Sequence, residues 1–581
     1  MGKIKSNRGE KMQSTSVPDD LALERIYRWE REGGRRVFLT QPYGGGKVRQ
    51  WTWAEAVGES RRMAAYLKAQ NWPPGTRIAI LSRNCAWWLL SDFAIWMAGH
   101  VSVPVYPSLK PQSVRQILEH SEAKACFLGA TDEKDMAGLA LPAGVCAISL
   151  PTAADTGRVA WDALLAATPA MTESPTRPAS DLATIIYTSG TTGMPKGVMH
   201  SFGNFSYNVK TLASMIGLAS EERILSYLPL AHIVERVAVE FLFVFLGARI
   251  FFTEGLETFI TDLRRAQPTL FLSVPRLLLK FQQNVFAKIS QQKLQRLFRI
   301  PLVNRLVKRR ILTALGLNTV GYAACGAAPL PPGVLLWYRE LGLNLVEGYG
   351  MTETLVTHVP APGTLRPGYV GAAIAGVEAR LGEEAELQIR SPMTMLGYYK
   401  DPQETQASFL ADGFFHTGDV AEIASDGQLK IVGRIKEQFK TSKGKYVAPA
   451  PIENKLAAHP AVEACCLMGA GLASPFAVAL LSEEARERCH NPQARTALED
   501  SLASVLEQTN RQLAPHERVR FIAIVNGPWS IGNGLMTPTL KLKRPLIEAR
   551  YQPLADDWNA RQRPIVWETA PEPSRTHASK P

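Results

Sequence analysis

The chain has 581 residues, 46% of them hydrophobic, which is enough apolar material to bury the cores of more than one domain. It has no hydrophobic run of the roughly 18 to 20 residues that a membrane span needs. It also has no apolar leader segment and no C-x-x-C pair among its seven cysteines, so we expect a cytoplasmic protein without disulfides or structural zinc. The net charge is +12, but the usual nucleic-acid-binding modules are absent, and we expect no nucleic-acid partner.

The first part of the chain alternates between helical and strand patterns. Residues 1–20 are polar and predicted to be disordered. Beyond them the pattern predicts helices at 53–69, 86–98 and 113–121 and strands at 77–82, 101–106 and 123–128. This alternation indicates a parallel sheet covered by helices.

A loop rich in glycine and hydroxyl groups follows a predicted buried strand at 182–187. Three glycines and a proline within residues 190–197 prevent regular structure and let backbone amides converge. Four side-chain hydroxyls accompany them: Thr188, Ser189, Thr191 and Thr192. Together with the charge of Lys196, these donors suit a polyphosphate. Because no Ser or Thr follows the lysine, this is not the G-x-x-x-x-G-K-[ST] loop.

A strand pattern that begins at Ile224 leads into a loop with His232, and a helical apolar pattern follows from 234 to 245. A lone histidine is more often structural than functional, so His232 by itself indicates little.

The segment 263–339 is strongly basic, with 13 Lys or Arg and no Asp or Glu. A strand is predicted at 268–275, and two amphipathic helices are predicted after it. The apolar face of the first helix is formed by Leu278, Phe281 and Val285, and that of the second by Leu294, Phe298, Leu302 and Leu306. Pro301 is expected to kink or split the second helix. Two interpretations remain open for 263–310. It contacts an anionic membrane surface, or it is the solvated face of an ordinary helical hairpin.

Two later segments carry small residues and a candidate ligand set. The run at 321–330 is built of small residues, which let backbone approach a flat ligand closely. A strand pattern from 343 precedes Tyr349, which is flanked by glycines and suited to stacking on a purine. Glu353 follows where a carboxylate can hold a hard cation that bridges phosphates.

The C-terminal part predicts a compact α+β unit over about 435–560. Its pattern gives a strand at 464–468, another around 476–481, a helix at 494–508 and a strand at 519–525. From about 556 onward, Pro, Arg and Ser indicate a loose tail.

The stretches 187–200, 343–354 and 411–419 together resemble the signatures of the adenylate-forming (AMP-binding) superfamily, which contains acyl-CoA synthetases, luciferases and adenylation domains. The resemblance covers about residues 25–550. It implies an α/β fold with a large N-terminal domain of stacked mixed β-sheets covered by helices and a small mobile α+β C-terminal domain. The expected boundaries are 1–20 for the disordered N-terminus, 21–433 and 434–555 for the two domains with a hinge at Lys436, and 556–581 for the tail.

The resemblance also implies roles for individual residues. The expected catalytic residues are Lys196, His232, Glu353, Arg434 and Lys541, of which His232 borders the carboxylate pocket and Lys541 is the mobile lysine of the small domain. The expected nucleotide and cofactor residues are Thr188, Ser189, Gly190, Thr191, Thr192, Gly193, Lys196, Gly326, Ala327, Tyr349, Thr352, Asp419, Arg434, Lys436, Lys440, Gly444 and Lys541. Gly326 and Ala327 face adenine, Asp419 accepts the ribose hydroxyls, and Glu353 and Thr188 hold Mg²⁺.

The activity implied is ATP-dependent conversion of a fatty acid to acyl-AMP, followed by transfer to coenzyme A. The spacing of Lys440 and Gly444 and the segment 536–541 resemble the long-chain fatty acid–CoA ligases, whereas 433–437 departs from their usual pattern. Two alternatives remain open: a fatty acyl-AMP ligase that supplies a carrier protein, and a non-catalytic acyl-nucleotide-binding protein. The sequence indicates no oligomeric state.

Overall fold

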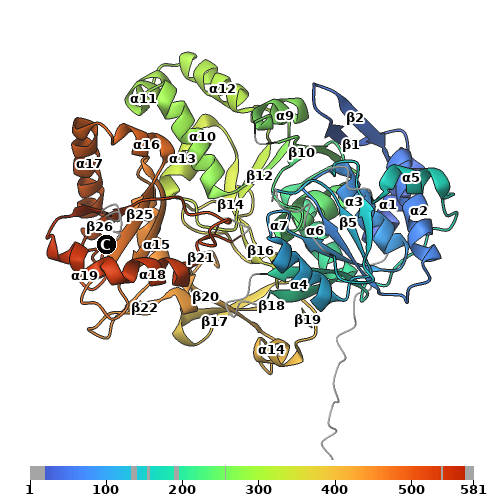
Figure 1. Ribbon diagram of the computed structural model, residues 1–581. Coiled ribbons are helices and arrows are strands. Elements are labelled where there is room, and N and C mark those ends of the chain that lie inside the picture. Colours follow the sequence, from blue (N-terminus) through green and yellow to red (C-terminus); the bar gives the residue numbers. More distant parts are fainter. Residues whose placement is uncertain are drawn as a thin grey trace, which may run out of the picture.

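The computed structural model describes residues 20–132, 141–153, 158–188, 195–255, 257–537 and 541–568. The N-terminal residues form one side of the molecule, and the C-terminal residues lie on the opposite side, beside the segments that follow residue 259 (Figure 1).

The largest sheet is built mainly from the N-terminal part and has the strand order β19-β9-β8-β4-β3-β5-β6-β7. Pairing from β4 through β7 is parallel, whereas β8 and β9 form an antiparallel hairpin that β19 extends. The strands are β3 (Arg77–Leu81), β4 (Val101–Val105), β5 (Ala125–Leu128), β6 (Cys146–Ser149), β7 (Val159–Ala160), β8 (Leu182–Thr188), β9 (Lys196–Ser201) and β19 (Gly397–Tyr398).

Helices cover this sheet, as the alternating pattern predicted. Every residue of α3 (Ala86–Met97) is buried because the helix lies between α2 (Trp53–Ala69) and the strands. Thr52 caps α2 reciprocally with Glu55, which fixes where that helix begins. The other helices of this region are α1 (Ala22–Gly33), α4 (Pro111–Ser121), α5 (Trp161–Ala167) and α6 (Phe202–Ile216).

Two smaller sheets and a two-stranded ladder form the middle of the molecule. One sheet has the order β10-β11-β1-β2 and the other β12-β13-β14, and β15 pairs with β16. Their strands are β1 (Val37–Pro42), β2 (Val48–Thr52), β10 (Arg223–Ser226), β11 (Arg249–Phe252), β12 (Leu270–Ser273), β13 (Tyr322–Cys325), β14 (Leu345–Glu347), β15 (Tyr349–Met351) and β16 (Leu355–His358). Their helices are α7 (Ile233–Glu235), the π-helix η2 (Arg236–Phe241), α8 (Leu242–Leu246), α9 (Phe259–Ala266), α10 (Pro275–Lys288), α11 (Gln291–Phe298), α12 (Val303–Leu315) and α13 (Pro332–Leu341).

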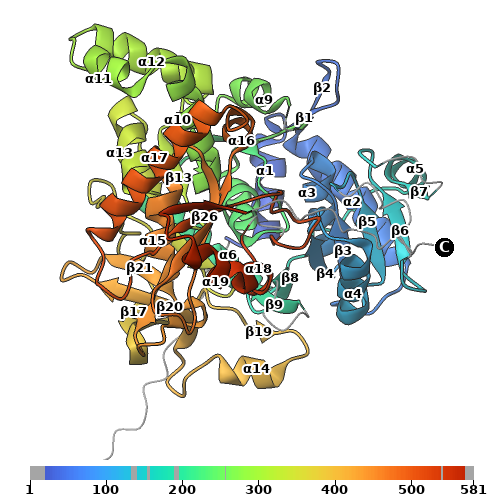
Figure 2. The ribbon, with the colours of Figure 1, turned by 60° about the vertical axis from the view of Figure 1, so that its left-hand side comes forward.

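An antiparallel sheet of order β17-β18-β20-β21 leads to the C-terminal unit. It contains β17 (Glu378–Leu381), β18 (Glu386–Arg390), β20 (Phe415–Ile423) and β21 (Leu429–Arg434), with the short helices η3 (Glu383–Ala385) and α14 (Pro402–Ala407) nearby in the sequence. In both views α14 lies at the edge of the molecule, next to β19 (Figures 1 and 2).

The C-terminal unit has its own sheet, β24-β25-β26-β27, with a hydrophobic cluster on each face. Along β24, Cys465 and Leu467 belong to one cluster and Cys466 and Met468 to the other, as the two-residue period of a strand requires. The elements are η4 (Ile435–Glu437), β22 (Phe439–Lys440), β23 (Tyr446–Val447), α15 (Pro449–Ala457), β24 (Val462–Met468), β25 (Phe476–Leu481), α16 (Glu483–Arg488), α17 (Pro492–Asn510), β26 (Ile522–Val525), α18 (Arg544–Tyr551), η5 (Gln552–Leu554), α19 (Ala555–Ala560) and β27 (Ile565–Trp567).

Two expectations are wrong. The chain does not become a loose tail at 556, because α19 buries Trp558 and β27 pairs in parallel with β26. The face expected to unite Leu294 and Phe298 with Leu302 and Leu306 does not exist either. Helix α11 ends before Pro301 and α12 begins anew at Val303, so the first two residues are buried and the last two are exposed.

The described residues contain no helix that is both long and apolar enough to cross a bilayer.

Candidate active site

The predicted phosphate loop joins the two strands of the β8–β9 hairpin. Thr188, the last residue of β8, pairs with Lys196, the first residue of β9. The ends of the loop are therefore adjacent at one edge of the large sheet. Five of the predicted loop residues lie outside the described part of the chain: Ser189, Gly190, Thr191, Thr192 and Gly193.

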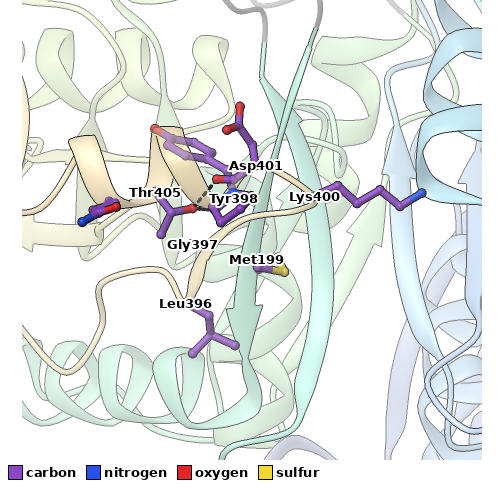
Figure 3. Close-up of a pocket in the computed structure, with 9 residues that line it drawn as sticks. Met199, Leu396, Gly397, Tyr398, Lys400, Asp401 and Thr405 are labelled. Carbon is purple, nitrogen blue, oxygen red and sulfur yellow. Dashed lines mark hydrogen bonds between the residues drawn. The ribbon is translucent and has the colours of Figure 1, made fainter.

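Lys196 has two partners that the sequence analysis did not identify. Its ammonium group forms an ion pair with Glu404 of α14, and it lies 5.1 Å from the centre of the Tyr398 ring. Asp401 caps α14 by accepting a hydrogen bond of 3.0 Å from the Glu404 backbone, and the Tyr398 backbone donates to Thr405 Oγ1 over 2.8 Å (Figure 3). These bonds hold the first turn of α14 against β19, and with it the carboxylate that faces Lys196.

Tyr398 also connects this lysine to Glu353. Its hydroxyl donates a hydrogen bond of 3.1 Å to Glu353 Oε1, and the Glu353 carbonyl accepts one of 2.7 Å from the Met395 backbone. Burial raises the pKa of Glu353, while hydrogen bonds from the backbone and from Tyr398, and the charges of Arg434 and Lys196, oppose the rise. The neighbouring Thr352 carbonyl lies 2.6 Å from His200 Nε2.

A surface hollow of about 380 Å³ lies between β9, β19 and the start of α14. Figure 3 shows that Lys400, at its edge, extends away from the Tyr398 ring. Lys400 forms an ion pair with Glu122 over 2.7 Å instead, so it does not add to the charge around Lys196.

The predicted ribose carboxylate is buried and held from two sides. Asp419 of β20 accepts a hydrogen bond of 2.6 Å from the Tyr349 hydroxyl at Oδ2 and lies 2.9 Å from Arg434 Nε at Oδ1. Arg434 is its cross-strand partner in β21. A carboxylate offers about four lone-pair positions, so positions remain for the hydroxyls of a diol.

An apolar cavity of about 100 Å³ begins beside these groups. The small residues Gly326 and Ala327 line it together with Tyr349, and Ala327 has a φ of +66°. Its apolar walls come from the helical stretch after His232 and from β12 and β13, and include Val234, Val237, Ala238, Leu242, Leu270, Leu272 and Ala324. The predicted purine-facing residues and an apolar pocket therefore share one cavity.

His232 forms the N-cap of α7, where its Nδ1 accepts a hydrogen bond of 3.2 Å from the Val234 backbone. Burial, followed by the positive charge of Lys541, lowers the pKa of His232 to about 4, so the ring is neutral near pH 7. Because Nδ1 accepts, the ring proton resides on Nε2.

Lys541 belongs to the C-terminal unit but lies close enough to Arg434, Asp419 and Glu353 for their charges to change its pKa. Desolvation lowers the pKa of Lys541 and Arg434 lowers it further, while Asp419, Glu437 and Glu353 act in the opposite direction. The residue nevertheless keeps contact with solvent. The Lys541 backbone donates a hydrogen bond of 3.0 Å to Thr537 Oγ1.

Three predicted residues stay apart from this cluster. Lys436 lies in the exposed part of η4, Lys440 lies 5.5 Å from the Tyr446 ring, and Gly444 occupies a turn with a φ of +74°. Within the described part of the chain, neither the Lys436 nor the Lys440 side chain forms a hydrogen bond or ion pair with Asp419, Glu353 or Lys196.

Comparison with known proteins identifies the family. Residues 27–399 match the model of the AMP-binding enzyme family, and residues 436–561 match that of the AMP-binding enzyme C-terminal domain. The chain belongs to the AMP-binding enzymes. It is 31% identical to long chain acyl-CoA synthetase 6, peroxisomal, of Arabidopsis thaliana, over 86% of this chain and 80% of that protein. It is also 31% identical to the long-chain-fatty-acid–CoA ligase FadD15 of Mycobacterium bovis, over 86% of this chain and 90% of that one.

Solved structures share the fold of this AMP-binding enzyme. The adenylation domain of a carboxylate reductase from Mycobacterium chelonae superposes with a TM-score of 0.78 at 22% identity, covering 94% of this chain and 92% of that one. The expected α/β architecture, with a large N-terminal domain of mixed sheets and a C-terminal domain, is confirmed.

The donor set of this AMP-binding enzyme fits a magnesium ion brought in with a nucleotide. Mg²⁺ is typically held by one or two carboxylates together with substrate phosphates. Glu353 would supply one hard oxygen ligand close to Lys196, and the Thr188 hydroxyl lies at the start of the loop that Lys196 closes.

Sequence reasoning missed Tyr398 and Glu404. The run Asp401-Pro-Gln-Glu404 carries a helix-start signal, an N-cap aspartate followed by proline, and this signal predicts α14. Nothing in the sequence, however, indicates that Glu404 meets a lysine 208 positions earlier.

Proposed function

We propose that this AMP-binding enzyme is an acid–thiol ligase that activates a long-chain fatty acid with ATP and then transfers the acyl group to coenzyme A. The observation that supports it most is the shared neighbourhood of Lys196, Glu353, Asp419, Arg434 and Lys541 beside one apolar cavity. The names of the two relatives above support the long-chain acid and the thiol acceptor.

In the first half-reaction, an oxygen of the fatty acid carboxylate attacks the α-phosphate of ATP. The bond from the α-phosphate to pyrophosphate breaks, and acyl-AMP forms. Asp419 binds the ribose hydroxyls. Tyr349 and the small residues Gly326 and Ala327 form the walls around the adenine. His232 presents a neutral Nε2–H to the carboxylate of the fatty acid. Lys541 and Lys196 spread the charge that develops on the phosphates. A magnesium ion on Glu353, with Thr188, would neutralise phosphate charge.

In the second half-reaction, the thiol of coenzyme A attacks the acyl carbon, AMP leaves, and the thioester forms. We propose that the small domain turns at Lys436 between the two steps, which withdraws Lys541 and exposes a different face to the acyl-AMP. Lys440 and Gly444, on the same side of this hinge as Lys541, would move with it.

The cavity must widen to hold a long acyl chain. Its volume of about 100 Å³ corresponds to roughly three water molecules at about 30 Å³ each. One wall contains the π-helix η2, and π-helical turns occur frequently at functional sites. We infer that side chains along this wall move apart when the acid enters.

The test is acyl-CoA formation from fatty acids of graded length, with ATP and coenzyme A, followed by separate detection of AMP, acyl-AMP and acyl-CoA. The proposal expects free acyl-CoA and a preference for long chains. Accumulated acyl-AMP with no acyl-CoA would favour transfer to a carrier protein, a possibility that the similarity to a carboxylate reductase adenylation domain keeps open. If no acid leads to pyrophosphate release, the protein would instead be a non-catalytic acyl-nucleotide-binding protein.

A further inference from the structure

The tip of the hairpin formed by α11 and α12 exposes large aliphatic side chains. Ile300 is 48% exposed, Leu302 76% and Leu306 70%, although Leu294 and Phe298 of the same hairpin are buried. Both views show α11 and α12 at the periphery of the molecule (Figures 1 and 2). We call the three exposed residues, with the basic residues around them, the hairpin tip.

The two helices of the hairpin and the turn between them carry seven cations: Lys293, Arg296, Arg299, Arg305, Lys308, Arg309 and Arg310. None of them forms an ion pair with a carboxylate of the described residues. In contrast, Arg265 and Arg276 of the same acid-free segment pair with Asp262 and Glu463. Lys308 lies 5.0 Å from the centre of the Phe298 ring, but none of the seven charges is neutralised by a described carboxylate.

The backbone conformation at position 302 is also unfavourable for a leucine. Its φ is +68°, and the Val303 amide donates to the Pro301 carbonyl over 2.8 Å, which makes Leu302 the centre of a γ-turn of the rare positive-φ kind. Glycine would adopt this conformation with less strain. An exposed leucine here serves neither the turn nor the core.

We propose that the hairpin tip binds the surface of an anionic phospholipid bilayer, with Ile300, Leu302 and Leu306 inserted among the acyl chains and the surrounding cations on the headgroups. Unpaired basic residues beside an aliphatic edge are the chemistry of a helix that lies at a membrane interface. A single-stranded nucleic acid would instead be matched by aromatic stacking residues, and the exposed side chains of the tip are aliphatic.

The hairpin is continuous with the wall of the apolar cavity. Its buried residues Leu294 and Phe298 belong to the same hydrophobic cluster as Leu278 of α10 and Phe271 of β12, and Phe271 lines the cavity. Membrane attachment at the tip would hold this side of the protein near the lipid surface. The binding itself does not depend on the proposed reaction.

The experiment measures binding of the full chain to phosphatidylcholine vesicles with and without phosphatidylglycerol, across salt concentrations. We expect binding that requires phosphatidylglycerol and weakens with salt. The triple change Arg305→Gln, Arg309→Gln and Arg310→Gln should weaken it about a hundredfold, since each charge near the surface contributes about fivefold. Leu302→Gly with Leu306→Ser should weaken it about tenfold or more, while the turn at 302 becomes less strained.

The matched control neutralises three exposed arginines elsewhere, Arg28, Arg115 and Arg511, and should bind like the parent. Turnover of a short soluble acid should be the same in all variants. The proposal is wrong if the unmodified protein does not bind anionic vesicles or if the hairpin variants bind them as well as the unmodified protein does. Loss of a dimer in the leucine variant without lipid would assign the tip to a second copy of the chain, and this too would overturn it.

Discussion

Asp419 shows how individual residues prepare this site before a nucleotide arrives. The Tyr349 hydroxyl and Arg434 each engage one of its oxygens, so the carboxylate is fixed by groups from two other strands. Burial and the Asp419 charge raise the pKa of Tyr349 well above its usual value, which keeps the hydroxyl protonated as a donor.

Tyr349→Phe removes that donor and keeps the ring that bounds the purine. We expect the KM for ATP to rise about tenfold to a hundredfold, because a hydrogen bond to a charged group contributes about 1.5 to 3 kcal/mol, while the KM for the fatty acid stays the same. Steady-state kinetics with each substrate varied in turn measures this. Tyr446→Phe, whose ring is exposed in the small domain, is the control. An equal rise in both KM values would contradict the ribose assignment.

Glu404 forms an ion pair with Lys196, the lysine proposed to bind phosphate. Glu404→Gln should free the lysine and tighten ATP binding a few-fold, since a pair whose side chains are 26% and 39% exposed contributes at most about 1 kcal/mol. Direct ATP titration of the variant measures the effect. Glu122→Gln, which breaks the nearby pair with Lys400, should not change it. Weaker ATP binding in Glu404→Gln would mean that Glu404 positions the lysine rather than competing for it.

At the scale of elements, the sequence is a good guide where a local signal and the core agree. Helix α2 spans the predicted residues because an apolar face, the Thr52 cap and Glu55 all indicate the same start. The sequence is a poor guide where the chain changes direction within a run of regularly spaced apolar residues. Leu302 and Leu306 continue the spacing of Leu294 and Phe298, but the break at Pro301 rotates them to the surface. The strand β27 was missed because its apolar run, Ile565–Trp567, is only three residues long and follows a polar stretch.

The wall formed by η2 gives a test of the acyl pocket. Ala238 lines the cavity and is the small residue of this wall, so Ala238→Phe fills space that a long chain would need. We expect kcat/KM for long acids to fall at least tenfold and that for short acids to stay within about twofold, because one blocked methylene position already costs about 1 kcal/mol or more. Activity measured with acids of graded length tests this, and the short acids serve as the internal control. A uniform loss at every length would place the acid elsewhere.

At the scale of the whole molecule, two contacts accompany the present orientation of the C-terminal unit. Arg276 of α10 forms an ion pair with Glu463 of β24, and Gln283 donates to the Pro460 carbonyl over 3.4 Å. In this orientation the charges of Arg434, Asp419 and Glu353 act on the pKa of Lys541. The motifs indicated which residues gather, but the sequence carries no signal for the Arg276 contact, which joins positions 187 residues apart.

The central claim is that Lys541 serves one half-reaction only, because it reaches the phosphates in one orientation of its domain. The direct measurement is a comparison of the two half-reactions in Lys541→Ala, with His516→Ala in the same domain as a control. Pyrophosphate release from ATP and fatty acid should fall about a hundredfold to a thousandfold, since the variant loses one cation aimed at charge that develops in the transition state. Acyl-CoA formation from supplied acyl-AMP and coenzyme A should remain within about tenfold of the parent. An equally large loss in both half-reactions would contradict the account, because Lys541 would then support the small domain itself.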